Sequence, residues 1–238
     1  MLNVPSLGAS RDAVVYHDQL ASSWEQRYQK PSFRSRLEVL AKCLERRDLR
    51  GTEWLDAGCG TGTLSRWLAD QGCVVLGVDA APNMINAAAT LANSGAGRGL
   101  PRFEVVETIA RLPMSSRSAD GILCSSVLEY VPDPQACLME FARVLRPGGT
   151  LLVSIPNADS CIRRSQIGCH RLGQLLGRKW IAYLNYSKNQ YSSAQFERML
   201  VNRGFGFDRV LPFGGPIPRW MQRTHTWGPL LLFSARKL

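Results

Sequence analysis

A regular alternation of strand-like and helix-like segments between residues 53 and 157 constrains the fold of this chain more than any other feature of its sequence. Short apolar runs of strand length alternate with longer segments in which apolar side chains recur every three or four residues. Strands joined by helices pair in parallel, and the helices cover both faces of the sheet, so the pattern predicts an α/β fold with a doubly wound, mostly parallel sheet. The predicted strands are 53–57, 73–78, 103–106, 121–124 and 150–155, and the predicted helices are 63–71, 82–92 and 134–145.

The regions that flank this alternation follow a different pattern. Residues 1–50 are expected to form an N-terminal helical extension, and residues 158–190 a helical insert that mixes basic and apolar side chains. The α/β pattern resumes over 191–238 with a helix whose capping box is predicted at Ser192 and Gln195. Because no repeat or flexible linker divides the chain, we expect one domain. The last two predicted strands are 205–211 and 227–235.

Charge is distributed unevenly along the chain. The 29 basic and 19 acidic residues give a net charge of +10. Up to Asn157 there are 16 of each sign, whereas the remainder carries 13 basic and 3 acidic residues. A neutral body with a basic last third indicates a local surface that meets an anionic group, rather than a general nucleic-acid binder.

Composition excludes several classes of protein. With 45% hydrophobic and 20% charged residues, the chain is not disordered overall. No apolar run approaches the roughly 20 residues needed to cross a bilayer. The first ten residues contain no Lys or Arg and no long apolar stretch, so a signal peptide is not expected. The seven cysteines show no C-x-x-C spacing, which argues against a zinc site and favours reduced thiols in a cytoplasmic protein.

A glycine-rich loop at residues 56–62, with the sequence Asp-Ala-Gly-Cys-Gly-Thr-Gly, follows the first strand and precedes a helix. Glycines allow a ligand to approach the backbone closely, and a carboxylate such as Asp79, which ends the next strand, can bind both hydroxyls of a ribose. The NAD fingerprint would require a third glycine at Thr63. The Asp56 carboxylate would repel a diphosphate but attract a sulfonium. The loop therefore favours S-adenosylmethionine over NAD.

Five motifs occur in order over residues 50–157: Leu55–Gly62, Gly77–Asp79, Leu112–Pro113, Ser125–Pro134 and Arg143–Gly149. Together they resemble the motifs of class I S-adenosylmethionine-dependent methyltransferases, in particular the quinone-biosynthesis and natural-product types. The resemblance implies a seven-stranded sheet with an antiparallel final strand, and a cofactor bound over the carboxyl ends of the strands. It implies a single methyltransferase domain over 1–238, with an N-terminal lid (1–50), a cofactor-binding core (51–157), an acceptor cap (158–190) and a C-terminal part (191–238).

The resemblance also implies which residues contact the cofactor. Ala57, Gly58 and Gly60 would line its methionine part, Asp79 would hold its ribose, Ala80 and Met84 would flank its adenine, and Ser125 would lie near the transferred methyl group. Asp56 is a further cofactor-binding candidate through the attraction of its carboxylate for a sulfonium. Thr108 and Ile109 occupy the place of an Asp-Ala pair near the adenine edge, and Thr at the Asp position leaves that contact open. In the lid, Tyr16, Trp24 and Tyr28 resemble spaced aromatic residues, and Arg36 resembles an arginine that clamps the cofactor carboxylate.

Candidate residues for the acceptor lie after the fourth strand and in the insert. Some quinone-type enzymes hold a metal at the positions of Ser126, Glu129 and Tyr130; only one of the three is a ligand type here, so no metal is predicted. Tyr130 and His170 are the candidate catalytic residues, with His170 as general base and His17 and His225 as weaker candidates. Tyr130 and His170, together with Arg163 and Arg164, are the candidate acceptor-binding residues.

The predicted function is methyl transfer to a hydroxyl or carboxyl oxygen of an amphipathic or anionic small molecule in a biosynthetic pathway. The alternatives are N-methylation of a small molecule, methylation of RNA through the basic last third, and a non-catalytic cofactor-binding partner subunit. Nucleic acid is not the favoured partner, because no RNA-binding module is recognisable. Contact of the insert with an anionic membrane is a further expectation, and the oligomeric state stays open.

Overall fold

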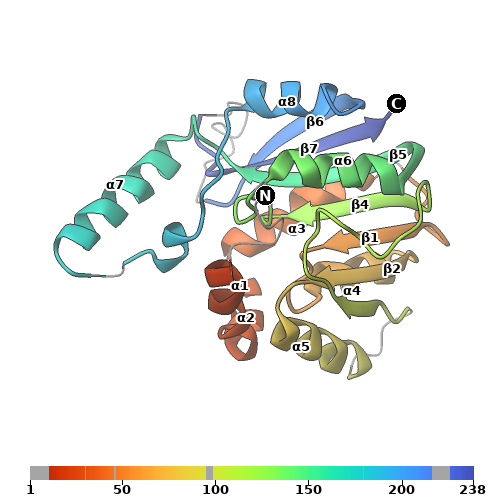
Figure 1. The fold of residues 1–238 in the computed structure, drawn as a ribbon, viewed down its shortest axis with the longest axis horizontal. Coiled ribbons are helices and arrows are strands. Elements are labelled where there is room, and N and C mark those ends of the chain that lie inside the picture. Colours follow the sequence, from red (N-terminus) through yellow and green to blue (C-terminus); the bar gives the residue numbers. More distant parts are fainter. Residues whose placement is uncertain (1–10, 30, 46, 95–98, 179, 216–225) are drawn as a thin grey trace, which may run out of the picture.

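A seven-stranded sheet forms the centre of the structure, a computed structural model that describes residues 11–29, 31–45, 47–94, 99–178, 180–215 and 226–238 (Figure 1). The strand order is β3-β2-β1-β4-β5-β7-β6. Neighbours from β3 to β5 pair in parallel, and β7 runs antiparallel to both β5 and β6. The strands are β1 (Glu53–Ala57), β2 (Val74–Asp79), β3 (Arg102–Val105), β4 (Ala119–Ser125), β5 (Leu145–Pro156), β6 (Phe205–Phe213) and β7 (Leu230–Lys237).

This topology confirms the predicted fold class and the antiparallel final strand. The largest difference is at β5, which begins at Leu145 instead of residue 150. Leu145 pairs with Ala119 before the register shifts, so the chain enters the sheet as soon as helix α6 (Pro134–Val144) ends. The Arg-Pro-Gly-Gly run at 146–149 therefore lies within the strand instead of in a separate turn.

Helices cover both faces of the sheet. On one face, α3 (Pro31–Leu44) and α4 (Thr63–Asp70) share an apolar cluster with the strands. On the other face, α6 and α8 (Ser193–Val201) contribute Phe141 and Phe196 to a second cluster. The predicted capping box of α8 is confirmed, since the Ser192 and Gln195 side chains each bond the other residue's backbone N–H.

The remaining helices surround one end of the sheet. The short helices α1 (Arg11–Asp18) and α2 (Ala21–Tyr28) pack against α5 (Pro82–Asn93). The insert forms α7 (Cys161–Leu175), which stands away from the sheet in Figure 1, and the short 3₁₀ helix η1 (Ala182–Asn185). No helix within the described residues is long and apolar enough to span a bilayer.

Candidate active site

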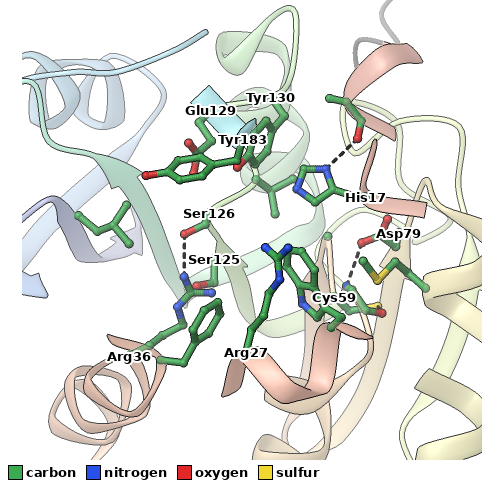
Figure 2. A pocket seen from close by; sticks show the side chains of 18 of the residues that line it. His17, Arg27, Arg36, Cys59, Asp79, Ser125, Ser126, Glu129, Tyr130 and Tyr183 are labelled. Carbon is green, nitrogen blue, oxygen red and sulfur yellow. Dashed lines mark hydrogen bonds between the residues drawn. The ribbon is translucent and has the colours of Figure 1, made fainter. Parts of the chain in front are cut away.

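A cavity of about 290 Å³ lies beyond the carboxyl ends of β1, β2 and β4. The strand order reverses between β1 and β4, and open α/β sheets bind ligands at such a switch point. Side chains from the lid helices and from the insert complete its wall. In Figure 2, Glu129, Tyr130 and Tyr183 line one side of this space, and Arg27 and Arg36 extend toward it from the other.

The glycine loop after β1 forms part of the floor through Gly58 and Gly60. Both have positive φ, at +79° and +54°, in the left-handed region that favours glycine. A Cβ on Gly58 would lie 2.3 Å from a methyl carbon of Val127, which follows β4. The backbone here is thus packed too closely against the β4 loop for a side chain.

Asp79, at the end of β2, presents its carboxylate to the cavity. Its two oxygens accept hydrogen bonds from the backbone N–H groups of Gly60 and Ala81, each at 2.9 Å (Figure 2 shows the bond to the loop). Burial raises the pKa of Asp79, while these hydrogen bonds and the nearby His17 oppose that shift. Each oxygen keeps a second lone pair, so the group can still accept from ribose hydroxyls.

Asp56 does not face the cavity, contrary to the role expected from its place in the loop. It is 1% exposed, and the Ser65 hydroxyl of α4 donates to its carboxylate at 2.6 Å. Burial raises the pKa of Asp56 to about 7. Along β1, Asp56 shares its face with Trp54, which belongs to the cluster on the α3 and α4 side. Its direct attraction for a sulfonium is therefore not supported.

Arg36 extends from α3 to the cavity, where its Nη2 donates to the Ser126 hydroxyl at 3.1 Å (Figure 2). Its Nε is buried and has no hydrogen-bond partner in the described part of the chain. Ser126 has a φ of +59°, which is rare for a residue other than glycine and marks local strain. An unpaired buried donor on a positive side chain can receive a carboxylate.

A buried polar cluster closes the opposite end of the cavity. The Arg163 guanidinium of α7 lies 3.7 Å from the Glu129 carboxylate, and the two side chains are 3% and 4% exposed. Arg163 also donates to the Tyr183 and Ser187 hydroxyls at 3.2 and 2.7 Å. Burial raises the pKa of Glu129, and the Ser187 and Arg163 contacts oppose that shift. The insert is thus fixed to the β4 loop by paired, opposite charges.

The predicted site residues divide into two groups. The cavity wall includes Tyr28, Arg36, Gly58, Gly60, Asp79, Met84, Ser125, Tyr130 and Arg163. It does not include Asp56, Ala57, Ala80, Thr108, Ile109, Arg164 or His170. The cofactor and acceptor roles of both groups stay predictions.

The residues outside the wall have other contacts. Ile109 belongs to the core under the sheet. Arg164 is exposed, 3.9 Å from Asp159. His170 is buried within the insert, where one ring nitrogen lies 3.1 Å from the Asn185 side chain. This position separates His170 from the cavity, so the structure argues against its predicted role as the base.

Sequence reasoning underestimated one residue of the wall. His17, in the last turn of α1, lines the cavity beside Asp79 and Tyr130. Helical spacing to Trp24 and Tyr28 could not have identified it, because α1 ends at Asp18 and those two residues lie on the separate helix α2. His225, the other weaker candidate, lies outside the described residues.

No group of three His, Cys, Asp or Glu side chains among the described residues is arranged to hold a metal ion. Glu129, the one ligand type at the three metal positions of quinone-type enzymes, faces the Arg163 guanidinium. The seven cysteines are free thiols, five of them buried.

Comparison with known proteins agrees with this geometry. The family model described as "Methyltransferase domain" matches residues 55–153. A ubiquinone biosynthesis O-methyltransferase of Xanthomonas oryzae pv. oryzae is 33% identical over 144 residues, 60% of this chain and 59% of that protein. The corresponding protein of Xanthomonas euvesicatoria pv. vesicatoria is 31% identical over 176 residues, 74% of this chain and 70% of its own length. The chain belongs to the class I S-adenosylmethionine-dependent methyltransferases. It spans about three fifths of the length of the first of these relatives.

Solved methyltransferase structures share the fold. Magnesium protoporphyrin IX methyltransferase of Synechocystis PCC 6803, with bound S-adenosylhomocysteine, has a TM-score of 0.69 at 20% identity, covering 94% of this chain and 99% of that chain. An S-adenosylmethionine-dependent methyltransferase of Mesorhizobium loti has a TM-score of 0.64 at 20% identity, covering 85% and 98%. At these identities the likeness concerns the fold alone.

The residues present fit the cofactor of this family. Gly60 exposes bare backbone to the cavity, where a Cβ would have only the Trp24 ring within 4 Å, at 3.6 Å, and Asp79 presents a carboxylate in the same wall. The unpaired Nε of Arg36 is a donor for the carboxylate of the methionine part. These three features lie on one continuous wall.

Proposed function

We propose that this protein transfers a methyl group from S-adenosylmethionine to a hydroxyl oxygen of an amphipathic phenolic small molecule. One observation carries the proposal: a single cavity joins the glycine loop and Asp79 to the polar end formed by Glu129, Arg163 and Tyr183. A cofactor and a small acceptor can therefore meet in one cavity. The names of the ubiquinone biosynthesis relatives support oxygen as the methylated atom.

The shape of the wall supports an aromatic acceptor. Its aromatic rings offer flat apolar surfaces, while the hydroxyls at the insert end offer hydrogen bonds to a polar ring substituent. Bound S-adenosylmethionine supplies an electrophilic methyl group on a sulfonium. The chain must then hold the acceptor oxygen about 3 Å from that group and in line with the C–S bond. The aromatic residues of the wall are Trp24, Tyr28, Phe33, Tyr130 and Tyr183.

RNA is a weaker candidate for the acceptor. The notable excess of positive charge in the last third is partly engaged within the protein, since Arg163 faces Glu129 and Arg236 lies 3.1 Å from Asp208. An RNA-binding surface needs cations that are free to meet phosphates. The same excess would also make binding fall steeply with added salt, which is simple to measure.

The test incubates the purified chain with S-adenosylmethionine and 2-aminophenol, a probe that offers both a hydroxyl and an amine. Mass spectrometry is expected to find the O-methyl product together with S-adenosylhomocysteine. An N-methyl product would favour the first alternative, and methyl transfer to total tRNA alone would favour the second. Binding of S-adenosylhomocysteine in calorimetry without transfer to any of these probes would support a non-catalytic subunit.

The exposed C-terminal end of α7 combines apolar and basic side chains, which favours contact with an anionic membrane. Leu172, Leu175, Leu176 and Trp180 are exposed there, beside Arg171 and Arg178. We propose that this apolar and basic tip rests on an anionic membrane, which would bring the protein to an amphipathic acceptor held there. Flotation with phosphatidylglycerol vesicles tests this, with phosphatidylcholine vesicles as control. Equal recovery with both lipids would contradict the role of charge.

A further inference from the structure

His17 belongs to α1, and its ring lines the cavity close to Tyr130 and Asp79. It lies in the last turn of α1, and its ring packs edge-on against Trp24 of α2 and Tyr130 of the β4 loop, with centroids 5.5 and 4.7 Å away. On its own helix, Tyr16 packs against it at 5.1 Å. Contacts from three segments therefore fix the orientation of the ring.

One hydrogen bond determines which ring nitrogen carries the proton. His17 Nδ1 lies 2.7 Å from the backbone carbonyl oxygen of Ala13, which can only accept. Nδ1 must therefore donate, and the neutral ring presents the lone pair of Nε2. Figure 2 shows this second nitrogen on the side of the ring opposite Ala13, toward the cavity. No hydrogen bond to a described residue engages it.

The charge state suits a proton acceptor. Burial lowers the pKa of His17, and Arg27 of α2 acts in the same direction, while the Ala13 hydrogen bond and Asp79 of β2 oppose it. A histidine with a lowered pKa is neutral at pH 7. The Asp79 carboxylate would stabilise the positive charge that appears when the ring takes up a proton.

The other titratable groups of the wall are less suited. Both oxygens of Asp79 already accept backbone hydrogen bonds. Glu129 faces Arg163 and accepts the Ser187 hydroxyl. Burial raises the pKa of Tyr130 well above its ordinary value, so its phenol keeps its proton. Within the described wall, His17 thus offers a neutral nitrogen base with an open lone pair.

We propose that His17 Nε2 is the general base that takes the proton of the acceptor hydroxyl during methyl transfer. This rests on the proposed function. The acceptor oxygen forms the new C–O bond while the C–S bond breaks, and the electron pair of that bond stays on sulfur. The O–H proton moves to Nε2, and the imidazolium then releases it to solvent. General bases of this kind contribute roughly 10²–10⁴-fold to rate.

A first test needs no acceptor. In ¹⁵N NMR of uniformly labelled protein, the imidazole signals absent from His17→Phe identify His17, since the chain has only three histidines. At pH 7 the ring is expected to be neutral with the proton on Nδ1, and to titrate below pH 6.5. A protonated Nε2 or an imidazolium at pH 7 would overturn the proposal.

The second test uses two probes, catechol and 4-nitrocatechol, whose more acidic hydroxyl is largely ionised at pH 8. For catechol, kcat is expected to fall about 100-fold or more in His17→Phe and in His17→Asn, which can still donate to Ala13. The acidic limb of the kcat/KM profile should disappear in both variants. For 4-nitrocatechol at pH 8 the loss should be less than 10-fold in both variants.

The outcomes separate the two claims. Wild-type protein that methylates neither of the two probes would contradict the proposed function, and with it the proposed role of His17. Active wild-type protein with variants of equal kcat, or with equal losses for both probes, would refute the base alone. Equal losses would assign His17 to packing of the lid.

Discussion

Replacing Asp56 by Asn tests how burial affects the charge inside the glycine loop. The Asp56 carboxyl is 1% exposed and its pKa is raised to about 7 in the folded protein. In the unfolded chain an aspartate has a pKa of about 3.9. The folded protein therefore holds a proton on this group over a pH range in which the unfolded chain has lost it.

The sign and size of the effect follow from linkage. Because the folded pKa is raised, the contribution of Asp56 to stability is fully present below about pH 4 and is lost as the pH rises toward 7. Each pKa unit between the two states is worth about 1.4 kcal/mol, so the whole difference is about 4 kcal/mol. Between pH 5 and pH 8, about 3 kcal/mol of this should disappear.

Urea unfolding of wild type and Asp56→Asn at pH 5, 6, 7 and 8 measures this contribution. An asparagine oxygen can still accept from Ser65, so the variant removes the ionisation and keeps the hydrogen bond. The free-energy difference between the two proteins should shift by about 3 kcal/mol in favour of the variant as the pH rises from 5 to 8. Asp48→Asn, a change at an exposed carboxyl whose pKa is lowered by Arg50, is the control and should show no such shift.

Parallel stability curves for wild type and Asp56→Asn would show that the carboxyl does not hold a proton in the folded protein.

The same variant also tests whether Asp56 contacts the cofactor. Because the carboxyl does not line the cavity, its affinity for S-adenosylhomocysteine should stay within about threefold of wild type, less than 1 kcal/mol. A tenfold loss would restore the direct role that the sequence suggested.

Three further substitutions test the site. Gly58→Ala should lower the free energy of unfolding by about 2–4 kcal/mol, because its Cβ would meet Val127 at 2.3 Å in a left-handed backbone. Adding Val127→Ala should recover part of the lost stability. Urea unfolding that shows no loss for Gly58→Ala would contradict the geometry. Asp79→Ala should weaken S-adenosylhomocysteine binding by about 1–3 kcal/mol in calorimetry, and unchanged affinity would place the ribose contact elsewhere. Arg163→Met should cost about 3–5 kcal/mol of stability, because it leaves Glu129 buried without its counter-charge. The double variant with Glu129→Gln should lose less stability than the sum of the two single variants. Additive losses in urea unfolding would show that the pair is not coupled.

The strands and helices of the core were predictable because their side chains repeat with regular periods. Leu64 and Leu68, one helical turn apart, are both buried under the sheet as their spacing implies. The start of β5 was not predictable, since it depends on the pairing of Leu145 with Ala119, 26 residues earlier in the chain. A proline and two glycines at 147–149 are typical of a turn, but here they lie along the strand.

The sequence predicted site residues well where they end a strand, and less well where the direction of the side chain decides whether it reaches the cavity. Asp79 ends β2 and reaches the cavity, whereas Asp56 lies within β1, and the alternation of strand faces turns it toward α4. The lid shows the same limit. The sequence analysis expected Tyr16 among the aromatic residues of the lid, but its ring stacks on Tyr186 of the insert at a centroid distance of 4.6 Å. Its neighbour His17 lines the cavity instead.

If the acceptor binds at the polar end of the cavity as proposed, the charges there account for the need for a base. Glu129 and Arg163 offset each other at 3.7 Å, so this end adds little net charge for an ionised acceptor to meet. A buried site of this kind favours a neutral hydroxyl over a phenolate, because an unpaired charge is costly to desolvate. A neutral hydroxyl must lose its proton as the new bond forms. In the proposed mechanism, the paired charges of the insert and the open nitrogen of His17 therefore act together: the acceptor binds as a neutral hydroxyl and loses its proton in place.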